Sequence, residues 1–335
     1  PISNLQTDIF ALDTQPIPSP STNILIGLDV PDDAAVLQVP PDRLLVQTID
    51  YFTAIMSDPF VFGQISANHA LSDLFAMGAN PQSVLAIATI PHGTEPHVEE
   101  TLYQLLSGAL RVLNRANATL IGGHTTEGTQ LAFGLACNGL AERDRLLRKG
   151  GMKPGQALIL TKALGTGTLF AANMRGLARG LWIEEAIASM LQSNQQAAEC
   201  FLAAGATACT DITGFGLLGH LIEMLRASRV AAMLQLDQIP ILAGAQITVE
   251  QGILSSLQAQ NKRAAQWIST AATICDRPTF PLLFDPQTSG GLLASVPLEN
   301  AASCLSQLHH LGYTQSAIVG STTPLTDPTQ LVTIM

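Results

Sequence analysis

The stretch TDITGFGLLGH, residues 210–220, decides between two fold classes. Gly214 to Gly219 match G-x-G-x-x-G, follow a short β-type run and open a helical pattern, with Asp237 ending the next expected strand. That arrangement is typical of dinucleotide-binding folds. However, regular patterns stop after Asp237, and Asp211 puts an acid where a pyrophosphate would sit. Because a lone fingerprint is a weak signal, dinucleotide binding is the minority interpretation.

Outward from this stretch, strands and helices are expected in a mixed order rather than in repeated strand–helix–strand units. The expected strands are 24–28, 35–39, 44–48, 83–90, 119–121, 131–140, 157–161, a short run into Asp211, 233–237, 292–296 and 316–320; helices are expected at 60–77, 97–116 and 217–226, in segments up to 206, and in a segment ending at Leu311. This pattern predicts an α+β fold with mixed sheets flanked by helices. The glycine-rich stretch 150–155 favours a boundary between an N-terminal domain, 24–150, and a C-terminal domain, 151–335, with residues 1–23 as an extended arm.

Composition narrows the class of protein. Of 335 residues, 13% are charged and 47% hydrophobic, which excludes a disordered chain. The longest apolar stretches, 83–90 and 131–137, are far shorter than the ~18 residues of a membrane span. A net charge of −10 argues against binding to nucleic acid or to an anionic membrane surface. Five cysteines without C-x-x-C spacing indicate reduced core thiols of a cytoplasmic protein.

Five aspartates lie beside small residues or at the end of apolar runs: Asp32, Asp33, Asp50, Asp73 and Asp211. A carboxylate just past a buried strand is held rigidly, which suits a hard cation such as Mg²⁺. For any single aspartate, a role in a turn or as a helix cap is the simpler explanation. Together, in a chain with so few charges, they predict a magnesium site.

Two glycine-bearing segments favour phosphate binding. Residues 122–126, GGHTT, directly follow a strand, and residues 285–291, DPQTSGG, precede one. Successive backbone N–H groups in such turns can bind an anion, although each segment also fits a plain turn between strands. Lys162 is either a phosphate contact or an ordinary lysine at a domain edge. The sequence contains no P-loop, G-x-S-x-G or H-E-x-x-H motif.

These motifs coincide with one family. The chain resembles the selenophosphate synthetases (selenide, water dikinases) in order and over nearly its whole length. The matching segments are DDAAV 32–36, QTIDYF 47–52, ALSDLFAMG 70–78, GGHT 122–125, LTKALG 160–165, TDITGFGLLGH 210–220 and DPQTSGG 285–291. The resemblance implies a two-domain aminoimidazole ribonucleotide synthetase-like fold with N-terminal strands pairing in a homodimer. It also implies conversion of ATP, selenide and water to selenophosphate, AMP and phosphate with Mg²⁺.

The resemblance also implies roles for individual residues. Asp33, Asp73 and Asp211 would hold metal, and Asp50 would contact ATP or its metal ions. Nucleotide would be contacted by Val30, Pro31 and Asp32, and by Gly123, His124 and Thr125 from the partner subunit. In this interpretation Gly214 to Gly219 form a helix-opening turn beside a metal ligand.

Two departures from the family pattern stand out. The family's catalytic Cys or selenocysteine and Lys, in a glycine-rich N-terminal loop, would fall at or before Pro1, and residues 1–31 contain neither Cys nor Lys. A trimmed chain, a fragment of a fusion with an oxidoreductase-like domain, or a non-catalytic ATP-binding paralogue would each explain this. The second departure is His69, where the family commonly has Asn.

Overall fold

The computed structural model describes residues 24–26, 36–270 and 272–335, so the predicted arm and the segment with Val30, Pro31, Asp32 and Asp33 lie outside the described residues. The chain divides into two compact units. The first comprises the described residues up to Phe75 together with Ala79–Leu146, and the second comprises Ala76–Gly78 with Leu147–Met335. The functional division into 24–150 and 151–335 stays a prediction.

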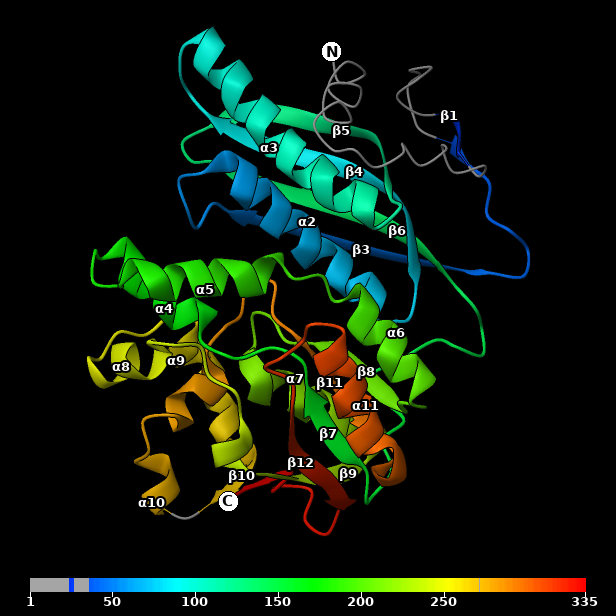
Figure 1. Cartoon of the computed structure of the whole chain (residues 1–335), viewed down its shortest axis with the longest axis vertical. Helices are drawn as coiled ribbons and strands as arrows, with labels where there is room; N and C mark the ends of the chain where they lie inside the picture. Colours follow the sequence, from blue (N-terminus) through cyan, green and yellow to red (C-terminus); the bar gives the residue numbers. More distant parts are fainter. Residues whose placement is uncertain (1–23, 27–35, 271) are drawn as a thin grey trace. The chain divides into compact units, whose positions relative to one another are not determined.

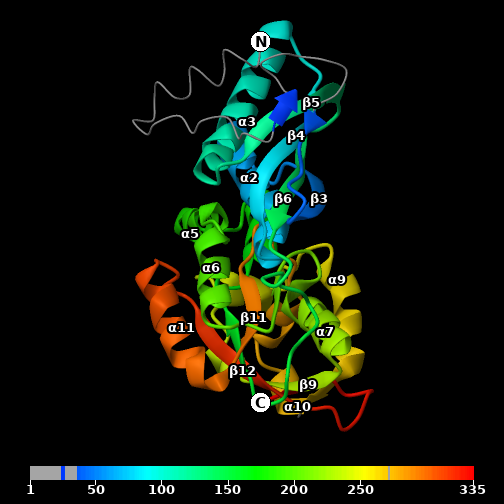
Figure 2. The same ribbon diagram turned by 90° about the vertical axis from the view of Figure 1, so that its right-hand side faces the viewer.

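The first unit is a four-stranded sheet, ordered β3-β6-β4-β5, with two helices on one face (Figures 1 and 2). Its elements are the short antiparallel pair β1 (Ile24–Ile26) and β2 (Val36–Leu37), then β3 (Leu44–Thr53), α2 (Pro59–Ala76), β4 (Asn80–Pro91), α3 (Glu95–Arg115), β5 (Thr119–Gly128) and β6 (Ala132–Ala141). Along β3, half-buried and exposed residues alternate, as expected of a strand with one covered face.

One prediction for this unit is wrong. Residues 122–126 do not form a turn, because β5 continues to Gly128 and pairs in parallel with β4, with His124 opposite Ile87. The two glycines suggested a turn because glycine is uncommon inside strands. Pairing with a long neighbouring strand overrides that local preference, so these residues present an extended backbone rather than an anion-binding nest.

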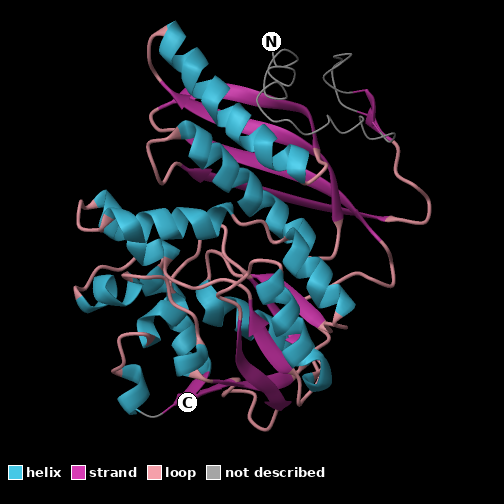
Figure 3. Ribbon diagram, in the orientation of Figure 1, coloured by secondary structure: helices cyan, strands magenta, loops and turns pink. Residues whose placement is uncertain are grey.

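The second unit is a seven-stranded mixed sheet ordered β10-β13-β9-β12-β7-β11-β8. Its strands are β7 (Ala157–Leu160), β8 (Ala208–Asp211), β9 (Val230–Leu234), β10 (Ile268–Thr270), β11 (Leu292–Val296), β12 (Ala317–Pro324) and β13 (Val332–Ile334). Its helices are α4 (Thr166–Met174), α5 (Gly180–Leu191), α6 (Gln195–Ala203), α7 (Gly216–Ser228), α8 (Ala245–Glu250), α9 (Gln258–Asn261), α10 (Ala272–Cys275) and α11 (Leu298–His310), with 3-10 turns η1 (Leu236–Gln238), η2 (Lys262–Trp267) and η3 (Phe280–Phe284). Helices and strands intermix in both units (Figure 3), which confirms the α+β class.

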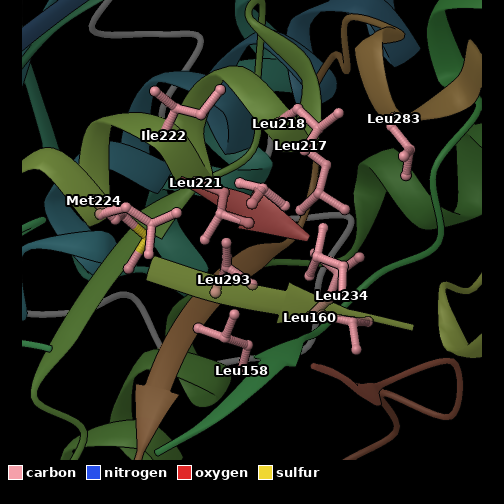
Figure 4. Packing of buried hydrophobic residues seen from close by; sticks show 14 of the residues in the cluster. Leu158, Leu160, Leu217, Leu218, Leu221, Ile222, Met224, Leu234, Leu283 and Leu293 are labelled. Atoms are coloured by element: carbon pink, nitrogen blue, oxygen red, sulfur yellow. The ribbon is translucent and has the colours of Figure 1, made fainter. Parts of the chain in front are cut away.

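The core of the second unit forms where α7 packs against the sheet. Leu217, Leu221 and Leu225 recur along one face of α7 and are fully buried. They pack with strand residues such as Leu158 and Leu293 in one apolar cluster (Figure 4). This packing fixes the start of α7, and with it the turn that follows Asp211.

Sheet topology excludes the dinucleotide interpretation. In that fold the strands on either side of the helix after the fingerprint are parallel neighbours. Here β8 lies at the edge of the sheet formed by the described strands and pairs antiparallel with β11, whereas β9 pairs with β12 and β13. Asp237 lies in η1 and forms an exposed ion pair with Arg277. The fingerprint is therefore only a helix-opening turn.

Among the residues that the model describes, no helix is both long enough and apolar enough to cross a membrane.

Candidate active site

In the first unit, two carboxylates from different elements lie close together. Asp50 is on β3 and Asp73 is near the end of α2, on the helix-covered side of the sheet. Thr48, two residues before Asp50 on the same face of β3, donates a hydrogen bond from Oγ1 to Oδ2 of Asp73 at 2.5 Å. His69, one turn before Asp73, has its Nε2 3.8 Å from Oδ1 of Asp50. The sequence predicted Asp50 and Asp73 as site residues, and the structure brings them together.

The electrostatics of this pair favour a bound cation. Partial burial raises the pKa of Asp50, the nearby Asp73 charge raises it further, and His69 lowers it. The His69 ring also packs edge-on against Phe52, with centroids 5.1 Å apart. Two mutually repelling carboxylates in a half-buried position gain more from a divalent cation than exposed ones would.

The described residues contain no group of three or more His, Cys, Asp or Glu side chains arranged to hold a metal ion. The Asp50–Asp73 pair supplies hard oxygen donors, the ligand type that Mg²⁺ takes, and Mg²⁺ commonly completes its shell with water and substrate phosphates. The donor set therefore fits a magnesium ion bound together with a nucleotide. Asp32 and Asp33, the other predicted acids of the N-terminal half, lie outside the described residues.

In the second unit, sheet pairing brings three separate motifs to one end of three adjacent strands. β11 lies between β7 and β8, with Leu293 opposite Leu160 and Leu292 opposite Asp211. The segments that follow β7 and β8 and the loop that precedes β11 therefore meet. Asp211 ends β8 and is 5% exposed. Asp211 belongs to the second unit and Asp73 to the first.

The loop 285–291 is tied to the segment after Asp211 by backbone hydrogen bonds. Ile212 N–H donates to the Gly291 carbonyl at 2.8 Å, and Gln287 N–H donates to the Thr213 carbonyl at 2.9 Å. A Cβ atom on Gly290 would lie 2.0 Å from the Ile212 carbonyl oxygen. Glycine is therefore required there, because only a residue without a side chain allows the two backbones to approach so closely.

The polar side chains of this loop bind the first turn of α4. Oε1 of Gln287 accepts from the N–H groups of Gly165 at 3.0 Å and Thr166 at 3.2 Å, and Oδ2 of Asp285 accepts from Gly167 N–H at 3.0 Å. The N–H groups of a helix start lack partners within the helix, and here this loop supplies them. The sequence predicted phosphate binding by this loop. In the structure, the side chains of Gln287 and Asp285 instead accept hydrogen bonds from backbone N–H groups of the protein itself.

Asp285 is an unusual carboxyl group. It is fully buried, and its Oδ1 atom has no hydrogen-bond partner among the described residues. Burial raises the pKa of Asp285 to about 7, although N–H groups of Thr168, Gln287 and Gly167 oppose the shift.

Gly123, His124 and Thr125 lie on β5, and all three are exposed. They are accessible to a ligand or a partner subunit, and their predicted contact with nucleotide stays a prediction.

Sequence reasoning about single residues missed His220, which is buried at the start of α7. Its Nε2 accepts the Thr213 backbone N–H at 3.1 Å, so it supports the turn after Asp211. Burial lowers the pKa of His220 to about 4, and the charge of Lys149 lowers it further. Because of this low pKa the ring is neutral, so Nε2 can accept the hydrogen bond. The signal was its position at the end of the same motif, residues 210–220.

Comparisons with known proteins agree with this arrangement. Residues 31–141 match the family model "AIR synthase related protein, N-terminal domain", and residues 153–329 match the corresponding C-terminal domain. Among solved structures, thiamine-monophosphate kinase from Stenotrophomonas maltophilia K279a superposes with a TM-score of 0.72 at 20% identity, covering 99% of this chain and 95% of that one. Hydrogenase Maturation Protein HypE in complex with ATP gives 0.70 at 17% identity, covering 96% and 86%. These matches define the class as a two-domain AIR synthase-like fold.

Closer relatives narrow the class. Selenide, water dikinase of Clostridioides difficile (strain 630) is 36% identical over 302 residues, covering 90% of this chain and 86% of the relative. That of Rhizobium meliloti (strain 1021) is 37% identical over 315 residues, covering 92% and 88%. The chain therefore belongs to the selenide, water dikinase family.

Proposed function

We propose that this protein is a selenophosphate synthetase, which converts ATP, selenide and water to selenophosphate, AMP and phosphate. The observation that carries the proposal is the match to proteins named selenide, water dikinase over about nine-tenths of the chain. The Asp50–Asp73 pair and the interlocked motifs of the second unit support it, because they fall within the segments that resemble this family.

The proposed metal ligands are Asp33, Asp73 and Asp211, with Asp50 contacting ATP or its metal ions. Bound Mg²⁺ would neutralise charge on the polyphosphate, a role for which this chain offers few basic residues, with 16 Lys and Arg in total. The chain's own contribution is to hold the carboxylates in place: Thr48 orients Asp73, and His69 lies beside Asp50. His69 thus contacts the site directly where the family commonly has Asn.

The proposed nucleotide contacts are Val30, Pro31 and Asp32, together with Gly123, His124 and Thr125 from the partner subunit of a homodimer. The exposed position of the β5 residues is compatible with reaching across a subunit interface. We also propose a cytoplasmic location, for which the unpaired cysteines give support: Cys137, Cys200, Cys209 and Cys304 are buried thiols and Cys275 is an exposed one.

The uncovered sheet face is the proposed dimer interface. Leu45, Ile49 and Tyr51 on β3 and Leu85 on β4 are exposed, at 46%, 60%, 47% and 38%. Leu45 also lines a cavity of about 210 Å³, together with Leu37, Val39 and Leu140 and with four polar residues, Gln38, Gln47, Gln82 and Asn138. Grouped apolar side chains of this kind commonly mark an interface, and two-fold homodimers are the commonest oligomers.

Ile49→Asp is therefore expected to convert the dimer to a monomer, because the substitution places a charge in an apolar interface. Sedimentation velocity measures the change in mass. The matched control is Leu298→Asp, since Leu298 is 65% exposed but lies at the start of α11 in the second unit. A wild-type protein that sediments as a monomer, or an Ile49→Asp variant that stays dimeric, would contradict the proposed interface.

The function is tested on the protein expressed with any residues that its gene encodes before Pro1. Purified protein is incubated anaerobically with ATP and Mg²⁺, with and without selenide, and the nucleotides are separated by chromatography. We expect AMP formation to rise with selenide concentration. ADP as the sole nucleotide product, at a rate independent of selenide, would reject the proposal.

A further inference from the structure

Lys162 is a buried lysine whose role the sequence left open. It comes two residues after the end of β7 and is 2% exposed. Its Nζ donates to two backbone carbonyl oxygens, that of Gln192 at 2.6 Å and that of Ser289 at 3.0 Å. Burial lowers the pKa of Lys162 to about 7, opposed by the nearby Asp211 carboxylate. Both the ammonium and the neutral amine have enough N–H groups to donate both bonds.

The carbonyls bound by Lys162 come from two segments that are also joined directly. Ser289 has a left-handed backbone, with φ of 48°, and its Oγ donates to the carbonyl of Met190 in α5 at 2.7 Å. Nδ2 of Asn194 donates to the Gly290 carbonyl at 2.8 Å. The end of α5 and the residues after it therefore hydrogen-bond to the second half of the loop 285–291. The buried Lys162 side chain adds a further link, because it binds one carbonyl from each of these two segments.

This loop in turn borders Asp211. The Gly291 carbonyl accepts the Ile212 N–H, and Gln287 N–H donates to the Thr213 carbonyl, so both residues after Asp211 are hydrogen-bonded to the loop. A displacement of the loop would therefore move the backbone that carries the Asp211 carboxylate.

We propose that Lys162 is a positioning residue for Asp211: by fastening loop 285–291 to the end of α5, it fixes the carboxylate that takes part in metal binding. The inference rests on the proposed function, because it takes Asp211 as a metal ligand. Residues that orient metal ligands from outside the coordination shell typically change metal affinity by ~10–100-fold when replaced.

The test is Lys162→Met, which keeps the length of the side chain and removes its hydrogen bonds. We expect a rise of about 10-fold or more in the Mg²⁺ concentration for half-maximal activity, with a much smaller change in kcat at saturating Mg²⁺. Calorimetric titration of the nucleotide-bound protein with Mg²⁺ should show the same loss of affinity without turnover. Hydrogen exchange of peptides covering 209–214 and 285–292 should be faster in the metal-free variant.

The matched control is Lys153→Met, because Lys153 lies in the same unit but is exposed and belongs neither to the loop nor to the segment after Asp211. It should leave Mg²⁺ affinity and exchange of both peptides unchanged. A folded Lys162→Met variant with wild-type Mg²⁺ affinity overturns the inference. If Lys162→Met does not fold, Ser289→Ala and Asn194→Ala each remove one tie to the same loop, and wild-type Mg²⁺ affinity in both overturns it equally.

Asp211→Asn separates this inference from the proposed function. If Asp211→Asn leaves Mg²⁺ affinity unchanged, the metal role of Asp211 is wrong. If Asp211→Asn weakens Mg²⁺ binding while Lys162→Met does not, only the positioning role of Lys162 is wrong.

Discussion

Replacement of Asp73 by asparagine is expected to lower selenide-dependent AMP formation by about 10²–10³-fold, a loss of the size seen when one electrostatic stabilising group is removed. Asparagine has the shape of aspartate and can still accept the Thr48 hydrogen bond, so the change removes charge with little effect on packing. The loss follows because the remaining Asp50 carboxylate offers a cation half the negative charge of the pair. The initial rate of AMP formation at saturating ATP measures it.

Asp58→Asn is the matched control for that experiment. Asp58 is exposed, and its Oδ1 accepts the Val61 N–H at the start of the same helix, α2. Asparagine caps helices as well as aspartate does, so this variant should keep wild-type activity and stability. An Asp73→Asn variant that is as active as Asp58→Asn would contradict the site.

Replacement of Asp285 by asparagine is expected to remove a strong pH dependence from the stability of the second unit. The pKa of the folded-state carboxyl, about 7, is raised above the ordinary value of 3.8. Between these values the folded protein holds a proton that the unfolded chain has released. The stability contributed by Asp285 is therefore fully present below about pH 4 and is lost as the pH rises through 7.

The expected size of this effect is at most about 4 kcal/mol, at 1.36 kcal/mol for each pKa unit. The free energy of unfolding of the wild type relative to Asp285→Asn should fall by an amount of that order between pH 4 and 7. Other groups titrate in both proteins, so their contributions to the free energy of unfolding cancel in the difference. Urea unfolding followed by tryptophan fluorescence reports on this unit alone, because the two tryptophans, Trp182 and Trp267, both belong to it. Parallel stability curves for the two proteins would show that Asp285 is ionised in the folded state.

Local patterns predicted the main elements of both units well. Apolar residues at helical spacing predicted a helix over 60–77, and α2 spans Pro59–Ala76; the apolar run 83–90 lies within β4. The three-residue strand β13 was not predicted, because so short a segment has no periodicity to recognise. The predicted strand 119–121 ended before the glycines, whereas β5 continues through them. Its continuation depends on pairing with β4, about 35 residues earlier in the chain, which local sequence does not show.

Sequence patterns pointed to the two described acids of the candidate site in the first unit, but not to the contacts that support them. Asp50 and Asp73 were identified from sequence, but the Thr48 bond that joins strand to helix depends on how α2 packs on the sheet. Gln287 and Lys162 appeared as polar residues available to a phosphate, whereas tertiary structure buries both and directs them to backbone groups. Sequence patterns show which residues can bind a ligand, but a buried backbone atom competes for the same hydrogen bonds.

The most direct test of the proposed activity is phosphorus NMR of the reaction mixture with ATP, Mg²⁺ and selenide enriched in ⁷⁷Se. Formation of a phosphorus–selenium bond would give a new resonance split by coupling to ⁷⁷Se, growing in step with AMP, and this is the predicted result. A spectrum that contains only nucleotide and inorganic phosphate signals after ATP has been consumed would contradict selenophosphate synthesis.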